Sequence, residues 1–182
     1  MVTAKRQIKF LDSVDVRKVI DIIPDDRVGL RDKALLEVLF STGLRVSEAL
    51  ALKSEQIKAV TGTMELTVIG KGGYQRVVFF SPVALSAVEA YKDSKPETEE
   101  LLFDFTPRTA QRMIKRRAIS AGLIQRVTPH TMRHSFATDL LRRGIDIRVV
   151  QRFLGHKSIT STMVYTGVTD LELANIHKRL YS

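Results

Sequence analysis

Apolar residues recur every three or four positions along most of the chain, and this spacing predicts a mainly helical protein. Asp12 can cap the first helix, because its carboxylate can accept a hydrogen bond from an unpaired backbone N–H group. Val16, Val19 and Ile20 would then share one face of that helix. Gly43 is placed to end the second helix. We therefore expect helices over about residues 12–23, 26–42, 46–52, 82–92, 107–121, 129–143, 147–154, 158–165 and 170–180.

Between residues 56 and 80 the helical spacing is replaced by the alternation typical of half-buried strands. Segments 64–69 and 76–80 are rich in β-branched and aromatic residues, and the glycines of segment 70–73 between them indicate a hairpin. A shorter strand near residues 56–60 would complete a three-stranded antiparallel sheet. The chain is therefore expected to belong to the α+β class, mainly α-helical with one small inserted sheet.

The composition excludes several classes of protein and favours one kind of partner. The 182 residues are enough for one domain with a hydrophobic core. The absence of cysteine excludes disulfides and cysteine-based metal sites, and no run of about 18 apolar residues could span a membrane. The formal net charge of +9 favours a polyanion, with nucleic acid ahead of an anionic membrane surface.

The positive charge is concentrated in one part of the chain. Segment 105–157 holds twelve lysines and arginines but only two acids. A single basic run is more often a solvated helix face, but here the bias persists through several predicted elements. The helix over residues 107–121 is the best candidate for DNA contact, through Arg112, Lys115 and Arg116. These side chains could read base edges in a groove, or could bind phosphates alone and so position the protein without specifying a sequence.

The segment from Thr128 to Thr138 holds the most concentrated candidate chemistry. Thr128 can cap a helix and Pro129 suits its first position. His130 then lies in the first turn and Arg133 follows three residues later, so we expect both on one face. The open N–H groups and the positive end of the helix dipole also favour an anion there. For His134 we expect a structural role, packed against the next helix.

Three further pieces carry candidate groups, each with a plainer alternative. Arg45 follows a glycine break and precedes Glu48 by three residues, which could be an ordinary surface ion pair. Lys71 sits in the glycine-rich turn and could be only a charged turn residue. His156 follows Gly155 at a helix end, and Tyr165, nine residues later, could be a half-buried core tyrosine.

Together these pieces resemble the tyrosine recombinases of the lambda-integrase and Xer type. The order arginine, lysine, His-x-x-Arg, histidine, tyrosine is the order of that family's active site. Segment Thr42–Leu50 resembles the family's first arginine box, Thr128–Thr138 its second and Leu154–Tyr165 its third. Lys71, between Gly70 and Gly72, resembles the lysine of the family's β-hairpin. The resemblance extends from about Phe10 to the end of the chain.

The resemblance implies the catalytic-domain fold of this family over residues 12–182, and a site-specific recombinase that cuts and rejoins double-stranded DNA. Tyr165 would attack the scissile phosphate and form a 3′-phosphotyrosyl bond. The arginines would clamp the phosphate oxygens and Lys71 would protonate the departing 5′-oxygen. Glu48 would hold these side chains in position without contacting the phosphate itself. The implied catalytic residues are Arg45, Lys71, His130, Arg133, His156 and Tyr165.

The resemblance also sets expectations about what accompanies the chain. No metal and no nucleotide cofactor are expected, because the arginines supply the electrostatics and the covalent link conserves the bond energy. Residues 1–11 would be a tail or the remnant of a linker, with the family's N-terminal core-binding domain absent. A full-length form would act as a homo-tetramer on synapsed DNA in the cytoplasm, at the nucleoid, whereas this chain alone would be a monomer.

Two alternatives remain open from the sequence. A type IB topoisomerase-like nicking-closing enzyme shares the catalytic set, although the recombinase-like boxes and the small size argue against it. A DNA-binding regulator without catalysis is the second alternative, and the complete set of catalytic residue types argues against that. The apolar stripe of the last helix could dock on a neighbouring protomer or fold back on its own core.

Overall fold

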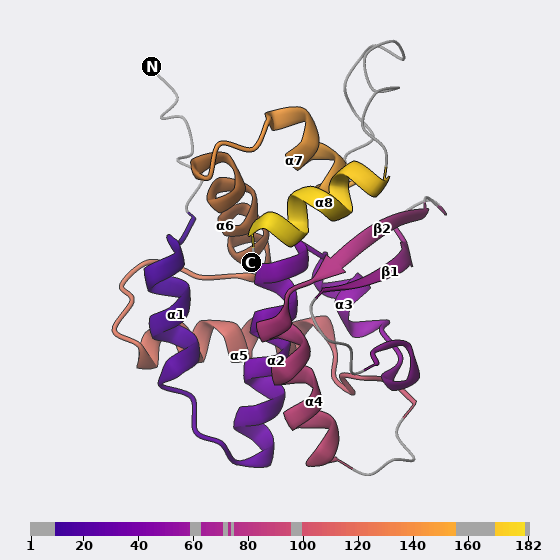
Figure 1. Cartoon of the computed structure of the whole chain (residues 1–182). Coiled ribbons are helices and arrows are strands. Elements are labelled where there is room, and N and C mark those ends of the chain that lie inside the picture. The colour runs from indigo at the N-terminus through magenta and orange to yellow at the C-terminus, as the bar shows by residue number, and fades with distance from the viewer. Residues whose placement is uncertain are drawn as a thin grey trace.

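The computed structural model describes residues 10–58, 63–70, 73, 75–95, 100–155 and 170–180. These residues form a mainly helical fold with one small sheet at its side (Figure 1). The elements are α1 (Ser13–Asp21), α2 (Arg27–Thr42), α3 (Val46–Leu50), the 3₁₀ turn η1 (Ser54–Gln56), β1 (Met64–Ile69), β2 (Gln75–Phe80), α4 (Pro82–Asp93), α5 (Pro107–Ser120), α6 (Pro129–Arg142), α7 (Ile147–Leu154) and α8 (Asp170–Leu180). The mainly helical α+β prediction is confirmed.

The helices begin where the sequence places capping residues. Asp12 accepts a hydrogen bond from the backbone N–H of Asp15 at 2.8 Å, and Asp26 accepts one from Gly29 at 2.8 Å. Thr128 caps α6 in the same way. Such a cap satisfies a backbone donor that the helix itself leaves unpaired, and it stabilises the helix by about 1 kcal/mol. Helices α1 and α3 end about two residues earlier than expected, and the helix predicted over residues 158–165 lies outside the described residues.

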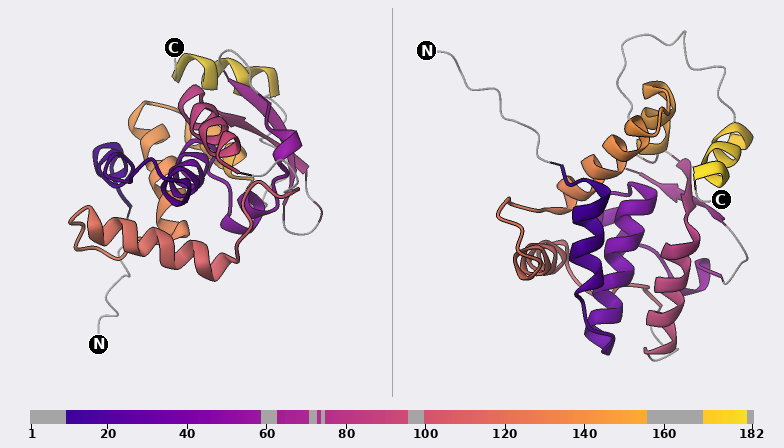
Figure 2. Two further views of the ribbon diagram at one scale, coloured as in Figure 1. Left: turned by 90° about the horizontal axis from the view of Figure 1, so that it is seen from below. Right: turned by 60° about the vertical axis from the view of Figure 1, so that its left-hand side comes forward.

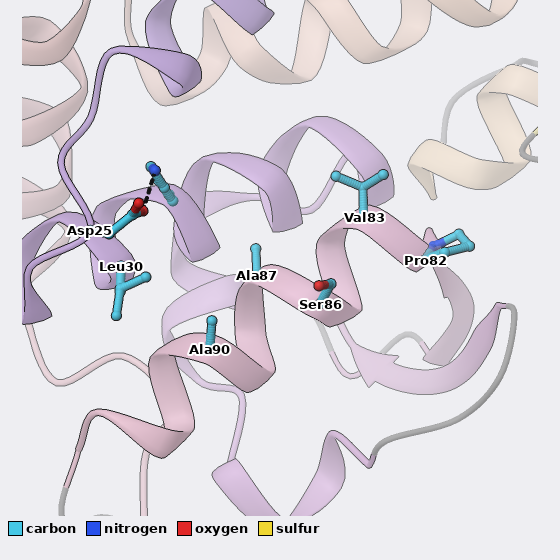
Figure 3. Close-up of a pocket in the computed structure, with 8 residues that line it drawn as sticks. Asp25, Leu30, Pro82, Val83, Ser86, Ala87 and Ala90 are labelled. Atoms are coloured by element: carbon cyan, nitrogen blue, oxygen red, sulfur yellow. Dashed lines mark hydrogen bonds and ion pairs between the residues drawn. The ribbon is translucent and has the colours of Figure 1, made fainter.

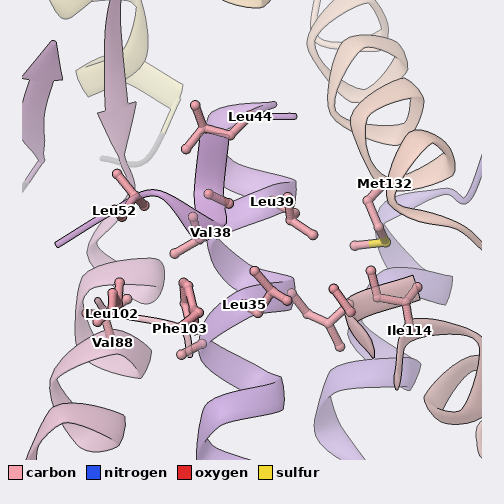
Figure 4. Packing of buried hydrophobic residues seen from close by; sticks show 14 of the residues in the cluster. Leu35, Val38, Leu39, Leu44, Leu52, Val88, Leu102, Phe103, Ile114 and Met132 are labelled. Atoms are coloured by element: carbon pink, nitrogen blue, oxygen red, sulfur yellow. The ribbon is translucent and has the colours of Figure 1, made fainter. Parts of the chain in front are cut away.

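Helix α2 is the centre of the fold, in contact with α1, α3, α4, α5, α6 and β2. Leu35 and Leu39 of α2 are fully buried, and Figure 4 shows them between Val88 of α4 on one side and Ile114 and Met132 of α5 and α6 on the other. Burying a side chain of this size contributes about 1.5–3 kcal/mol. In the left view of Figure 2, α1, α2 and α4 are seen nearly end-on, and α5 runs across the first two.

Two buried acids on α2 attach the flanking helices. Asp32 is paired with its neighbour Arg31 and, at 2.8 Å, with Arg117 of α5. Glu37 accepts a two-point contact from Arg17 of α1, at 2.5 and 2.7 Å. A buried carboxylate without such partners would be costly. These pairs therefore fix α1 and α5 to one side of the central helix.

The predicted three-stranded sheet is wrong: the described residues contain two strands. Strands β1 and β2 pair antiparallel with Met64 opposite Phe80 and Ile69 opposite Gln75. The start of the expected third strand is occupied differently, because Gln56 closes a 3₁₀ turn by accepting a hydrogen bond from the Lys53 N–H at 2.8 Å. Lys53 instead forms an isolated antiparallel bridge with Leu101. The chain just before the expected strand is therefore held by a 3₁₀ turn and by a contact with a distant segment.

A second apolar cluster holds the last helix against its own chain. Phe79 of β2 meets Phe153 of α7 edge-on, with ring centroids 5.8 Å apart. Leu173 and His177 of α8 are buried in the same cluster, and the His177 ring lies 5.3 Å from that of Phe79. Burial lowers the pKa of His177 to about 4, so the ring is neutral near pH 7. Helix α8 thus folds back on its own core.

None of the described helices is long and apolar enough to cross a membrane.

Gly43, which ends α2, cannot carry a side chain without a large cost. Its φ is +63°, a left-handed conformation that side chains disfavour by about 1–2 kcal/mol. A Cβ atom there would also lie 2.4 Å from Cδ1 of Phe136. We expect Gly43→Ala to lower the free energy of unfolding by about 2–5 kcal/mol in urea titrations, because overpacking adds about 1–3 kcal/mol.

Gly144 is the matched control for this substitution. Its φ is +80°, and a Cβ atom there would meet nothing within 4 Å. Gly144→Ala should therefore show the backbone cost alone. Equal effects of the two substitutions would mean that the contact with Phe136 is relieved without cost.

Candidate active site

Arg133 joins the ends of two helices that are far apart in the sequence. It leaves the second turn of α6 and is only 6% exposed. One terminal nitrogen donates to the carbonyl of Gly43, where α2 ends, and the other donates to the carbonyl of Leu154, where α7 ends, both at 2.5 Å. The C-terminal carbonyls of a helix have no partner inside the helix, so a buried guanidinium satisfies them well. The first and second arginine boxes therefore meet through Arg133.

Arg45 and Glu48 form the second part of the site. Arg45 precedes α3 in an extended conformation, and its Nη1 donates to Oε1 of Glu48 at 3.0 Å. The other carboxylate oxygen accepts the backbone N–H of Arg45 at 2.8 Å. The Glu48 side chain is buried, whereas the Arg45 side chain is 40% exposed. Glu48 therefore orients an arginine that still reaches solvent.

Arg76 completes the cluster, and it was not among the residues selected from the sequence. It lies on β2, directly after the hairpin turn, and contacts both oxygens of Glu48, at 3.1 and 2.7 Å. Its side chain is 11% exposed. The available signal was a charged residue at the start of the apolar run Val77–Phe80. That signal alone cannot name a partner 28 residues away.

The electrostatics of this cluster favour an anion. Burial acts to raise the pKa of Glu48, but the hydrogen bonds from Arg76 and from the Arg45 backbone, with the nearby positive charges, lower the pKa to about 2. Burial, together with the charges of Arg45 and Arg76, lowers the pKa of Arg133 to about 10. Two guanidinium groups, those of Arg45 and Arg76, thus contact one carboxylate, and a third, that of Arg133, lies within range of its charge. The remaining positive charge would be neutralised by a bound phosphate.

The depressed pKa of Glu48 predicts how stability changes with acid. Its contribution is present above the ordinary pKa of 4.5 and is lost as the pH falls toward the folded-state value of about 2. We expect wild type to exceed Glu48→Gln by about 3 kcal/mol near neutral pH, and this difference to shrink below pH 4.5. Urea unfolding of both proteins across this range measures it. A difference that stays constant with pH would contradict the assigned ionisation.

His130 is exposed at the start of α6, and its ring contacts His134 one turn later. The two Nε2 atoms lie 2.8 Å apart, and the rings meet edge-on with centroids 4.2 Å apart. Burial, with the adjacent charges of His130 and Arg133, lowers the pKa of His134. One ring must accept and the other donate in such a contact, so at least one nitrogen is unprotonated. His134, expected to have a structural role, therefore contacts a candidate proton acceptor.

Comparison with known proteins places this arrangement in a family. Residues 9–172 match the phage integrase family. The chain belongs to this family. The resemblance drawn from the sequence motifs is therefore confirmed.

Xer recombinases are similar to this integrase-family chain in sequence and in structure. Tyrosine recombinase XerA of Pyrococcus furiosus is 37% identical over 180 residues, which cover 94% of this chain and 61% of the relative. The crystal structure of XerA recombinase superposes with a TM-score of 0.74 at 29% identity, covering 98% of this chain and 67% of that one. XerH site-specific recombinase bound to its difH substrate gives a TM-score of 0.72 at 26% identity, covering 96% and 55%. The chain spans 55–62% of the length of the first curated relatives.

Three of the residues expected to be catalytic, Lys71, His156 and Tyr165, lie outside the described residues. The structure describes the elements on either side of them. Strands β1 and β2 bracket the turn that contains Lys71. Gly155 ends α7 with a φ of +63°, directly before His156. Arg45 and Arg133 are the catalytic candidates that the structure brings together, with Glu48 between Arg45 and Arg76.

The residues predicted to contact DNA lie on the exposed side of α5. Arg112, Lys115 and Arg116 line a shallow hollow of about 310 Å³ on this helix. Helix α5 contacts α3 and α6, which hold Glu48 and Arg133. The basic face therefore belongs to an element that adjoins the arginine cluster.

A larger hollow, of about 500 Å³, lies between α2 and α4, on elements other than those that carry the arginines (Figure 3). Its wall is mostly apolar, and Lys33 pairs with Asp25 at its edge. None of its lining residues is a candidate catalytic group. Among the described residues, no cluster of three or more histidine, aspartate or glutamate side chains could hold a metal ion.

Proposed function

We propose that residues 12–182 form the catalytic domain of a site-specific DNA recombinase that cuts and rejoins strands through a 3′-phosphotyrosyl intermediate. One observation carries this proposal: Arg45 and Arg133, from motifs far apart in the sequence, meet in one positively charged cluster around Glu48. A guanidinium matches the geometry of phosphate oxygens. The similarity to XerH bound to its difH substrate supports DNA as the ligand.

In the proposed reaction, the Tyr165 oxygen bonds to phosphorus as the bond to the 5′-oxygen breaks. Arg45 and Arg133 would bind the non-bridging oxygens, where negative charge builds in the transition state, and His156 would add a hydrogen bond. Attack by the free 5′-hydroxyl of another strand reverses these steps. Since one phosphodiester replaces another, no external energy source is required.

Two protons must move during this exchange. The phenol has an ordinary pKa of about 10, so a base must accept its proton as the bond forms. We assign this role to His130: when its Nε2 donates to Nε2 of His134, the neutral ring keeps the lone pair of Nδ1 free to accept a proton. Lys71, placed by the hairpin between β1 and β2, would donate the second proton to the leaving 5′-oxygen.

The proposed DNA contacts extend beyond the cleaved bond. Arg112, Lys115 and Arg116 of α5 would bind the backbone phosphates beside the site. A longer form of the protein would assemble as a homo-tetramer on two synapsed duplexes. For the chain alone we propose a monomer, which the burial of Leu173 and His177 against their own β2 and α7 supports.

A nicked suicide duplex tests the proposal. Cleavage near the nick releases a short 3′ fragment, so rejoining cannot occur and the covalent complex accumulates. With the upstream strand labelled at its 5′ end, we expect a labelled species that survives denaturing electrophoresis and disappears after protease treatment. If the protein binds and retards the duplex but forms no covalent species, the recombinase proposal is overturned. The DNA-binding regulator without catalysis is then the remaining alternative. No described feature favours the nicking-closing enzyme, and the similar proteins are named recombinases.

A further inference from the structure

Arg76 uses hydrogen-bond acceptor sites on Glu48 that the guanidinium of Arg45 would otherwise use. Each carboxylate oxygen accepts two hydrogen bonds, one from Arg76 and one from Arg45. Arg76 contributes both of its terminal nitrogens, which is the preferred two-point geometry of a guanidinium on a carboxylate. Arg45 contributes its backbone N–H and a single guanidinium nitrogen.

This division leaves Arg45 able to bind something else. Among the described residues, only one of its guanidinium nitrogens has a hydrogen-bond partner, and the side chain reaches solvent. Without Arg76, the buried charge of Glu48 would face Arg45 alone. Arg45 could then form a stronger, two-point contact with Glu48. Glu48 would compete with a phosphate for the guanidinium N–H groups of Arg45.

Arg76 is also held from a second side. A Cβ atom built on Gly155 would lie 2.6 Å from Cδ of Arg76 and 3.0 Å from its Nε. The side chain therefore passes directly against the residue that ends α7. Glu48 on one side and Gly155 on the other leave little room for Arg76 to turn away.

We propose that Arg76 is a positioning residue: it saturates Glu48, so that the guanidinium of Arg45 remains directed toward the scissile phosphate. The inference rests on the proposed recombinase function. Arg76 acts through Glu48 and Arg45 and does not itself contact the reacting atoms. Its effect should therefore depend on the charge of Glu48.

A double-mutant cycle separates this role from a merely structural one. Arg76→Met removes the two-point contact while keeping much of the side-chain volume. We expect the first-order rate of adduct formation on the suicide duplex to fall about 10–100-fold, a change of about 1.4–2.8 kcal/mol in the barrier. The dissociation constant for the duplex should stay within about threefold, because the other basic residues are unchanged.

The decisive comparison uses Glu48→Gln as the background. The amide keeps an oxygen that can accept the backbone N–H of Arg45, but it has no charge to draw in the guanidinium. We expect Arg76→Met to cost less than about threefold in rate when added to Glu48→Gln. Equal losses in both backgrounds would mean that Arg76 supports the site only by packing, and would overturn the inference.

Arg17→Met is the matched control. Arg17 makes the same two-point contact with a buried glutamate, Glu37, on the other side of α2. Its loss should lower the melting temperature without changing the rate of adduct formation in folded protein. All rates are measured well below the lowest melting temperature of the set, so that unfolding does not enter them.

The crystal structure of Arg76→Met decides the inference independently of catalysis. We expect Arg45 to contact Glu48 through two guanidinium nitrogens in the variant, against one in the wild type. An unchanged single contact would overturn the inference even if the wild type is an active recombinase. A wild type that forms no adduct would instead overturn the proposed function, while the geometry of Arg45 still reports on Arg76.

Discussion

Replacing Arg133 by alanine is expected to lower both the stability of the protein and the rate of strand cleavage in the proposed reaction. The guanidinium donates two short hydrogen bonds to the carbonyls that end α2 and α7, and both would lose their partner in a buried place. A hydrogen bond from a charged group contributes about 1.5–3 kcal/mol, so we expect a loss of about 3–6 kcal/mol in the free energy of unfolding.

The expected loss of cleavage by Arg133→Ala has a separate cause. Removing one group that stabilises transition-state charge typically costs about 10²–10³ in rate. Urea unfolding measures the first effect, and the rate of adduct formation in fully folded protein at low temperature measures the second. The sequence motif assigns Arg133 to the phosphate and gives no reason for it to stabilise the fold. A variant with wild-type stability would therefore contradict the contacts described above.

Arg133→Lys separates the two effects if the alanine variant does not fold. An ammonium retains the charge but cannot reach both carbonyls with the planar geometry of a guanidinium. We expect about half the loss of stability and a rate still well below that of the wild type. Recovery of the full rate would show that charge alone suffices at this position.

Replacing Tyr165 by phenylalanine is expected to abolish the covalent species while leaving duplex binding and melting temperature unchanged. Only the phenolic oxygen is removed, and in the proposed reaction that oxygen forms the bond to phosphorus. The arginines and the basic face of α5 would still bind the backbone. Denaturing electrophoresis with the labelled suicide duplex measures the adduct, and a gel-shift titration measures the affinity.

The other tyrosines provide the controls for this experiment. The sequence contains four tyrosines, and Tyr91 is buried against the ring of Phe103. Tyr91→Phe should retain the adduct, as should Tyr74→Phe and Tyr181→Phe. An adduct formed by Tyr165→Phe but lost in one of the others would move the nucleophile to that residue.

The parts of the fold that were predicted correctly depend on local chemistry. Asp12, Asp26 and Thr128 start helices because each can accept a hydrogen bond from a donor three residues later. Gly43 and Gly155 end helices because they adopt a positive φ. The third strand was predicted wrongly because the chain before it forms a 3₁₀ turn next to a bridge between Lys53 and the distant Leu101, which no local pattern indicates.

The same limit applies to the candidate site. The pairing of Arg45 with Glu48 follows from a spacing of three residues and was foreseen. Arg76 was missed because its partner is fixed by the position of β2 beside α3, which no local pattern gives. For Arg133 the motif indicated phosphate chemistry, but its burial beneath two helix ends could be seen only in the folded chain.

The bridge that Arg133 makes between the ends of α2 and α7 also bears on synthesis of the chain. The two carbonyls meet at Arg133 only when residues from Gly43 to Leu154 have been made and packed. A nascent or partly folded chain therefore has no complete phosphate-binding cluster, even though it already carries most of the required side chains. For the proposed recombinase, reactivity toward DNA would therefore arise only with completed folding.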